Sequence, residues 1–271
     1  MATVVGFISE KGGVGKTTAC YHIAVALSRF HGKRVLVIDA DYQRGGISGR
    51  FFPQLIEGFG TRTPTGITLF NKFQQLYSAM PQTPDIDILS CRDSIDLVPA
   101  DPRLATVSVD KLPSTSNIRE NNISLLSHLK TISTVLKGQQ SDYDYILIDS
   151  HPEVSDVMKS IIYASDYCVS PVKLDRQSSI GVATVIGEIS NVNDDIAMIR
   201  HSLKIEDGYT ETIFSGAMGM MAREYAAVLK QSEQLEYNRL RKSGKIFENY
   251  VTEGDGLRVA DVPPVFSSTR I

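Results

Sequence analysis

A glycine-rich stretch at residues 9–18, Ser-Glu-Lys-Gly-Gly-Val-Gly-Lys-Thr-Thr, constrains this chain more than any other feature. An apolar run at residues 4–8 precedes it and predicts a short buried strand, and apolar residues at helical spacing follow it from Ala19 to Phe30. A strand, a glycine-rich turn and a helix that opens with Lys-Thr make up the P-loop arrangement. Glycines let successive backbone N–H groups point at one centre, and the N-terminus of the helix adds partial positive charge there. The stretch therefore predicts a phosphate-binding loop.

This loop also predicts individual ligands for a nucleotide and its metal ion. We expect Lys16 to reach the β- and γ-phosphates and the hydroxyl of Thr17 to bind Mg²⁺. The residues that we expect to bind the nucleotide are Gly12, Gly13, Val14, Gly15, Lys16, Thr17 and Thr18.

Two further apolar runs, at residues 34–41 and 143–149, end in carboxylates. Their continuous hydrophobicity is typical of parallel strands that are covered on both faces, and ligands of such sheets bind at the carboxyl ends of the strands. Asp39 and Asp41 end the first run, although capping of the following turn is an alternative for one of them, Asp39 in particular. Asp149 ends the second run, and after a P-loop this pattern predicts a Walker B aspartate that binds Mg²⁺. His151 lies alone in the next loop, where a histidine is more often structural than catalytic.

Strand and helix patterns alternate along the chain, which predicts a doubly wound, mostly parallel α/β sheet flanked by helices. We find no internal repeat or linker and therefore expect one P-loop domain over residues 1–271. We expect further strands at residues 86–89, 95–98, 167–172, 212–216 and 245–251, and helices at residues 69–80, 123–136, 157–162, 182–189 and 222–241. Loops are expected at residues 42–65, 110–121 and 173–179, a break in the helical pattern at residues 191–195, and a closing turn or short helix at residues 257–266.

The composition is that of an ordinary globular protein, with 42% hydrophobic and 22% charged residues. A net charge of −3 argues against a histone-like polycation, but a local basic patch is still compatible with it. Cys20, Cys91 and Cys168 show no spacing of a metal site and fit a reducing cytoplasm. No apolar run approaches a membrane span, and we expect no signal peptide because a strand begins almost at the N-terminus.

The loop departs from the general P-loop pattern, because Glu10 stands where the first glycine is usual and a second lysine, Lys11, opens the loop. In this form it resembles the deviant Walker A box of the ParA/MinD family of ATPases. Similarity to that family continues at Val-Ile-Asp-Ala-Asp (37–41), Ile-Asp-Leu-Val-Pro-Ala (95–100), Tyr-Asp-Tyr-Ile-Leu-Ile-Asp-Ser-His-Pro (143–152) and residues 164–172. The resemblance covers roughly residues 1–190, more weakly residues 246–265, and is most specific at the P-loop.

The resemblance implies a homodimer that forms on ATP binding, with ATP and Mg²⁺ between the subunits. Lys11 would be the signature lysine that reaches the partner's phosphates, and Asp41 the acid that positions the attacking water. Asp39 and Asp149 match the acids around Mg²⁺. Two departures stand out: His151 precedes Pro152 after the Walker B aspartate, and the segment after Ser215 lacks the asparagine often found there, which leaves the adenine contacts open.

The resemblance is to the short ParA class, without an N-terminal helix-turn-helix domain. It implies slow ATP hydrolysis stimulated by a ParB-like partner, non-specific DNA binding in the ATP state, and a cytoplasmic, nucleoid-associated protein that segregates plasmid or chromosomal DNA. The basic residues that could contact DNA are Arg223, Lys230, Arg239, Arg241, Lys242 and Lys245, with Arg176, Arg200 and Lys204 as further candidates. For each of these, a solvated helix face is an equally good interpretation.

Four alternatives remain beside DNA segregation. A MinD-like membrane-cycling ATPase would need a terminal amphipathic helix, for which residues 263–271 are too short. An iron–sulfur carrier would need paired cysteines, and Cys91 and Cys168 lie in no such motif. Lys11 weighs against an ATP-dependent ligase of the biotin pathway. A ParA-like positioner of a protein cargo differs only in its partner, which the sequence does not reveal.

Overall fold

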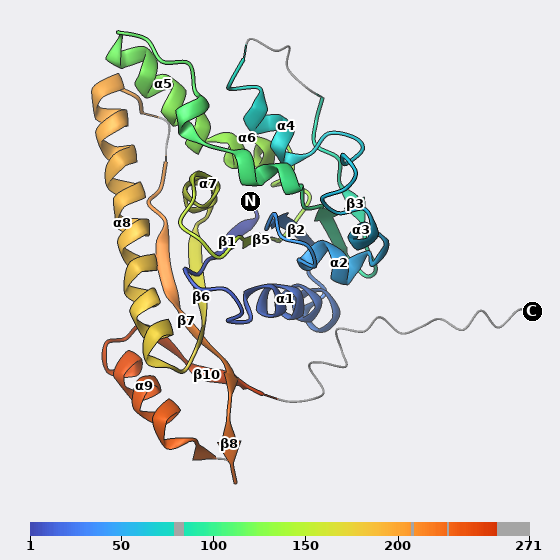
Figure 1. The fold of residues 1–271 in the computed structure, drawn as a ribbon, viewed down its shortest axis with the longest axis vertical. Helices are drawn as coiled ribbons and strands as arrows, with labels where there is room; N and C mark the ends of the chain where they lie inside the picture. The colour runs from blue at the N-terminus through green and yellow to red at the C-terminus, as the bar shows by residue number, and fades with distance from the viewer. Residues whose placement is uncertain (79–83, 207–208, 227, 254–271) are drawn as a thin grey trace, which may run out of the picture.

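The computed structural model describes residues 1–78, 84–206, 209–226 and 228–253 (Figure 1). Its main sheet has eight strands in the order β10-β7-β6-β1-β5-β2-β4-β3, all parallel except for the β3–β4 pair. The strands are β1 (Thr3–Phe7), β2 (Val35–Ala40), β3 (Leu89–Ser90), β4 (Ile95–Val98), β5 (Tyr145–Ser150), β6 (Tyr167–Lys173), β7 (Ile213–Ala222) and β10 (Ile246–Thr252). A separate antiparallel pair consists of β8 (Glu224–Tyr225) and β9 (Val228–Leu229). The prediction of a doubly wound, mostly parallel sheet is confirmed.

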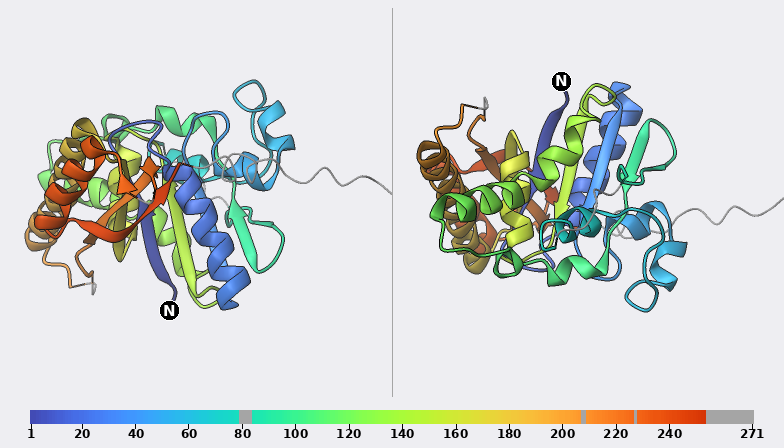
Figure 2. Two further views of the ribbon diagram at one scale, coloured as in Figure 1. Left: turned by 90° about the horizontal axis from the view of Figure 1, so that it is seen from below. Right: turned by 90° about the horizontal axis from the view of Figure 1, so that it is seen from above.

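Helices cover both faces of the sheet (Figure 2). In chain order they are α1 (Lys16–His31), α2 (Ile47–Phe51), α3 (Gln54–Glu57), α4 (Leu69–Gln74), α5 (Ile118–Leu129), α6 (Thr131–Lys137), α7 (Asp156–Ala164), α8 (Arg176–Leu203) and α9 (Gln231–Lys242). Two 3₁₀ turns, Pro102–Thr106 and Val109–Lys111, lie between β4 and α5.

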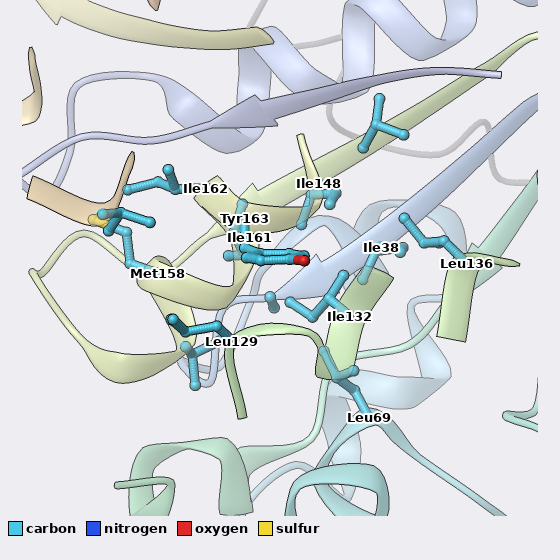
Figure 3. Close-up of a cluster of buried hydrophobic side chains, with 14 of the residues drawn as sticks. Ile38, Leu69, Leu129, Ile132, Leu136, Ile148, Met158, Ile161, Ile162 and Tyr163 are labelled. Atoms are coloured by element: carbon cyan, nitrogen blue, oxygen red, sulfur yellow. The ribbon is translucent and has the colours of Figure 1, made fainter. Parts of the chain in front are cut away.

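Side chains of each central strand alternate between two cores, one on each face of the sheet. Leu36 and Ile38 of β2 join the core under α4 to α8, whereas Val35 and Val37 join the core under α1. Figure 3 shows the first core, where Ile38 and Ile148 from the strands lie among side chains of α6 and α7. Burial on both faces explains why these strands are continuous apolar runs in the sequence.

The carboxyl ends of β1, β5 and β2 meet at one edge of the sheet. Phe7 of β1 is in register with Asp149 of β5, and Asp149 is in register with Asp39 of β2. The glycine-rich loop follows β1 at this edge. Two stretches from the first 41 residues and one from more than a hundred residues further along the chain therefore form one site.

Several predicted boundaries are wrong near the C-terminus. The long helix predicted at 222–241 does not begin at Ala222: β7 runs on to Ala222, β8 and β9 follow, and α9 starts only at Gln231. The spacing of Tyr225 and Val228 looks helical, but the two exposed residues pair with each other across the antiparallel strands β8 and β9. The predicted strand at 245–251 is confirmed as β10, while the turn predicted at residues 257–266 lies outside the described residues.

Other corrections concern loops and helix ends. The predicted break in the helix at residues 191–195 is wrong, because α8 continues through them. Val192 and Ile196 are buried one helical turn apart, and exposed polar residues lie between them. The predicted loop at 42–65 contains α2 and α3, and the loop at 173–179 is shorter because α8 begins at Arg176. One helix predicted at 123–136 is two, α5 and α6, with α5 starting inside the loop predicted at 110–121. The strand predicted at 86–89 is reduced to β3, and part of the helix predicted at 69–80 lies outside the described residues.

None of the helices in the described part of the chain combines the length and apolarity that a bilayer crossing needs.

Candidate nucleotide-binding site

The glycine-rich loop turns sharply into α1. Gly13 and Gly15 have φ angles of +69° and +90°, in the left-handed region that favours glycine. Gly15 caps α1, and a Cβ atom placed there would lie 3.1 Å from the Cε atom of Met220 on β7. The first N–H groups of α1 have no partner earlier in the helix, so they are available to an anion in the loop.

A cleft of about 340 Å³ lies over this loop. All the residues predicted to bind the nucleotide line it, together with Lys11 and Asp41. The cleft also has lining residues that the sequence analysis did not select: Gln43, Arg44, Gly45, Gly46, Arg50, Pro152 and Met221. Arg50 donates to the Thr18 hydroxyl over 2.9 Å. The sequence indicated this residue only as one basic side chain in the polar segment that follows the acids of β2.

Asp149 and Lys16 form a buried pair at the base of the cleft. The Nζ atom of Lys16 is 3.6 Å from Oδ1 of Asp149, and both side chains are almost inaccessible to solvent. No well-formed hydrogen bond reaches either carboxylate oxygen of Asp149 from the described residues. Burial raises the pKa of Asp149, and Lys16 and the nearby Thr17 hydroxyl oppose that rise. A buried carboxylate with open lone pairs close to Thr17 is the kind of oxygen ligand that Mg²⁺ takes, so these residues fit the predicted ion.

Both carboxylate oxygens of Asp39 accept hydrogen bonds from residues that follow β2. Its Oδ2 atom accepts hydrogen bonds from the backbone N–H (2.8 Å) and hydroxyl (2.6 Å) of Ser48, and its Oδ1 atom accepts one from the N–H of Asp41 (3.1 Å). Burial, reinforced by the neighbouring charge of Asp149, raises the pKa of Asp39 to about 7. These contacts support the capping alternative for Asp39, and its place around Mg²⁺ stays a prediction.

Asp41 is held by a histidine that the sequence analysis set aside as structural. The Nδ1 atom of His151 is 2.9 Å from Oδ1 of Asp41, and the same oxygen accepts the N–H of Gln43 over 2.9 Å. His151 is buried and stacked on Tyr42, with ring centroids 3.7 Å apart. The sequence held one indication of this contact: His151 comes two residues after Asp149. Because β5 and β2 are neighbouring parallel strands, the segment after β5 lies beside the segment after β2, which contains Asp41.

Lys11 lies at the mouth of the cleft and is partly exposed, with 41% of its side chain accessible. Its Nζ atom is 3.5 Å from Oδ2 of Asp175 and 3.2 Å from Oε1 of Gln177. Asp175 also caps α8 by accepting the N–H of Ser178 over 2.7 Å. Lys11 therefore contacts the N-terminus of α8, away from the buried pair of Lys16 and Asp149.

The basic candidates for DNA contacts do not form one surface. Arg176 begins α8 and Lys204 caps its other end, and a helix of 28 residues is about 40 Å long. Near the C-terminus, Arg223, Arg239 and Arg241 make ion pairs with Glu233, Glu236 and Glu248. Within the described ranges, Lys230, Lys242 and Lys245 make no ion pair.

A family model described as an AAA domain, AAA_31, matches residues 2–205, which include the whole loop, the acids and most of the sheet. The chain belongs to this family. Its relatives include the sporulation initiation inhibitor protein Soj of Bacillus subtilis, 26% identical over 217 residues, which are 78% of this chain and 75% of the relative. The chromosome-partitioning ATPase Soj of Thermus thermophilus is 27% identical over 210 residues, or 76% of this chain and 70% of the relative.

Solved structures share the fold of this AAA domain protein. The ATP complex of a Cyanothece McdA variant has a TM-score of 0.71 at 17% identity, over 96% of this chain and 86% of the other. A putative plasmid partition protein of Borrelia burgdorferi bound to AMPPNP has a TM-score of 0.64 at 20% identity, over 96% of this chain and 89% of the other. The resemblance to the ParA/MinD type of P-loop ATPase is thus confirmed for the family and the fold.

Proposed function

We propose that this ParA-type protein binds and hydrolyses ATP as a dimer and positions DNA. The observation that carries the proposal is the arrangement in one cleft of the buried Lys16–Asp149 pair, the exposed Lys11 and the His151-bound Asp41. In this proposal residues 1–271 act as one P-loop domain.

Each residue of the cleft has a role that follows from its surroundings. The loop N–H groups and Lys16 bind the triphosphate, and Thr17 and Asp149 would hold Mg²⁺, which neutralises phosphate charge when bound. Asp41 orients the attacking water, and His151 fixes the carboxylate of Asp41 by bonding one of its oxygens. Asp39 shapes the turn that brings Asp41 to the cleft, because it accepts the N–H groups of Asp41 and Ser48.

Lys11 would act on the nucleotide of a second subunit. Within one chain it is bound to Asp175 and Gln177 at the cleft mouth, and the flexible lysine stem can turn outward when these contacts break. A cation supplied by a partner stabilises the charge that develops on the transferred phosphoryl group. Hydrolysis is then tied to dimer formation, which suits a slow cycle that a ParB-like partner stimulates.

DNA is the cargo that the names of the relatives favour. Of the six cations in residues 222–245, Arg223, Arg239 and Arg241 are ion-paired, so Lys230, Lys242 and Lys245 are the candidates for phosphate contacts. The Thermus relative is named a chromosome-partitioning ATPase and the Borrelia structure a plasmid partition protein. We therefore infer non-specific DNA binding in the ATP state and a cytoplasmic, nucleoid-associated protein.

The test is the mass of the protein in solution with a slowly hydrolysed ATP analogue and Mg²⁺. We expect the wild-type chain to dimerise and Lys11→Ala to lose either dimerisation or turnover, while Lys137→Ala, an exposed lysine at the end of α6, behaves like wild type. Pelleting with DNA or with liposomes, each with ATP and with ADP, then tests the cargo. A Lys11→Ala protein that pairs and hydrolyses ATP like its parent would refute the proposed use of Lys11, and binding to liposomes but not to DNA would favour a membrane-cycling ATPase.

A further inference from the structure

The turn between β2 and α2 forms a second wall of the nucleotide cleft, beside the glycine-rich loop. Both ends of this turn are fixed. Oδ1 of Asp41 accepts the N–H of Gln43 over 2.9 Å, and Oδ2 of Asp39 accepts the N–H of Ser48 over 2.8 Å. Gly46 lies so close to Asp39 that a Cβ atom placed there would be 2.9 Å from Oδ2 of that carboxylate. The turn is therefore held in a defined position beside the cleft.

Arg44 lies in the middle of this turn, lines the cleft and is exposed. In the part of the chain that the structure describes, its guanidinium group makes no hydrogen bond and no ion pair. The two lysines of the cleft differ from it, because each lies near a carboxylate. The Nζ atom of Lys16 is 3.6 Å from Asp149. The Nζ atom of Lys11 is 3.5 Å from Asp175. Arg44 is thus a cation beside the phosphate-binding loop that is available to an anionic ligand.

A second guanidinium group from the same segment, that of Arg50, joins the two walls of the cleft. Its Nη2 atom donates to the hydroxyl of Thr18 over 2.9 Å, and its Cζ atom lies 5.8 Å from the centroid of the Tyr21 ring. Because Thr18 and Tyr21 belong to α1 and Arg50 to α2, these contacts fix the wall that carries Arg44 relative to the loop. Arg44 can therefore meet a ligand by rotation of its side chain, without movement of the turn, which lowers the entropy lost on binding.

The position of Arg44 along the chain favours the terminal phosphate of a nucleotide. In the function proposed above, the loop N–H groups and Lys16 bind the triphosphate from the side of α1, while Asp41 orients the water that attacks the γ-phosphate. Arg44 is three residues after Asp41, so their Cα atoms are at most about 11 Å apart. The planar guanidinium group presents paired N–H groups that match two oxygens of one phosphate. Contact with the γ-phosphate is therefore favoured over contact with the phosphates closer to the nucleoside.

We propose that Arg44 binds the γ-phosphate of the nucleotide in its own subunit and thereby makes the cleft distinguish ATP from ADP. The proposal rests on the ATP binding proposed above and assigns a further residue to it. ADP has no γ-phosphate, so Arg44 gains its contact only with ATP. Arg44 and Lys11 then have different tasks: Arg44 contacts the nucleotide before the subunits meet, and Lys11 contacts the nucleotide of the partner afterwards.

The experiment measures the affinity of the full chain for AMPPNP with Mg²⁺ and for ADP with Mg²⁺ by calorimetry. Protein concentrations are chosen at which light scattering gives the monomer mass. Arg44→Ala should weaken AMPPNP binding about tenfold and change ADP binding by less than about twofold, because one charge-assisted contact to the γ-phosphate is lost. Arg44→Lys keeps the charge but loses the paired N–H groups, so its AMPPNP affinity should lie between those of Arg44→Ala and wild type. Arg119→Ala, at an exposed arginine of α5 outside the cleft, is the matched control and should bind both nucleotides like wild type.

Three outcomes would overturn the inference and leave the proposed function intact. Equal losses of AMPPNP and ADP affinity in Arg44→Ala would mean that Arg44 supports the turn or binds a phosphate that both nucleotides share. Unchanged affinities of the monomer, together with a loss of dimerisation on AMPPNP, would mean that Arg44 acts on the partner's nucleotide. If Arg44→Ala matches Arg119→Ala in every measurement, Arg44 does not contact the nucleotide. A wild-type chain that binds neither nucleotide would instead refute the proposed function itself.

Discussion

The carboxylate of Asp41 depends on His151 for its orientation. The two side chains are 2.9 Å apart, and stacking on Tyr42 restricts the imidazole ring. We expect His151→Ala to lower the rate of ATP hydrolysis by about tenfold, as loss of an orienting partner does at other catalytic sites. Affinity for ATP should change little, because His151 does not line the cleft. Turnover and nucleotide binding measured side by side test this, and an equal loss in both would mean that His151 supports only the fold.

A second buried histidine, His128, predicts how stability depends on pH. Its ring packs near Phe73 and Tyr77. No well-formed hydrogen bond reaches either nitrogen from the described residues, although Asp156 lies close enough to favour the protonated ring in part. Burial lowers the pKa of His128, so the unfolded chain takes up this proton before the folded chain does. The free energy of unfolding should therefore fall as the pH drops below about 6.5, the ordinary value for histidine.

His128→Leu removes this source of acid sensitivity. The decrease in Tm between about pH 7.5 and about pH 5.5 should be smaller in His128→Leu than in wild type. His31→Leu, at an exposed histidine, is the control and should keep the wild-type decrease. Equal decreases in all three proteins would contradict the assignment.

At the scale of elements, α2 is joined to the sheet through one serine. The Ser48 hydroxyl donates to Asp39 at the end of β2 and accepts the N–H of Ala100, just after β4, over 2.8 Å. Ser48→Ala leaves that buried N–H without a partner, so we expect about 1–3 kcal/mol less stability. The loss is measured by denaturant unfolding of Ser48→Ala, with Ser141→Ala, at an exposed serine, as the control. A loss below 0.5 kcal/mol, roughly the level of a neutral surface change, would argue against this junction.

The loop into α1 gives a second test at this scale. Gly15 has a left-handed φ angle, and a side chain there would press on Met220 of β7. Gly15→Ala should therefore reduce ATP affinity at least about tenfold, since strain of 1–3 kcal/mol displaces the loop N–H groups. Gly138→Ala, at a position with open space around it, is the matched control. Unchanged nucleotide binding in Gly15→Ala would show that the loop does not bind phosphate.

For the whole molecule, the buried carboxylate of Asp149 predicts that dimerisation requires the metal ion. Asp149 and the triphosphate are both anionic, and Lys16 is the cation beside that carboxylate. We expect EDTA to return the ATP-analogue dimer to the monomer mass, and added Mg²⁺ to restore it. Light scattering measures both states, and a dimer that persists in EDTA would show that nucleotide alone closes the interface.

The sequence by itself determined those elements whose residue pattern can be recognised within a short stretch of the chain. The glycines and Lys-Thr pair of the P-loop, and the apolar runs of β1, β2 and β5, can be identified from residues close in the chain, because turn conformation and burial on both faces restrict the residue types. The P-loop and the acids at the cleft were therefore predictable, whereas their catalytic and metal-binding roles stay predictions.

Only the tertiary structure decided the contacts between distant segments. Asp39 turned out to bind Ser48, His151 to bind Asp41, and residues 224–225 and 228–229 to form an antiparallel strand pair instead of a helix. The pairing of β7 with both β6 and β10 extends that strand beyond its predicted end at residue 216 to Ala222, where the sequence predicted that a helix begins. Spacing along a chain reports which residues share a face of an element, but the partner of a buried polar group is set by the order of strands in the sheet.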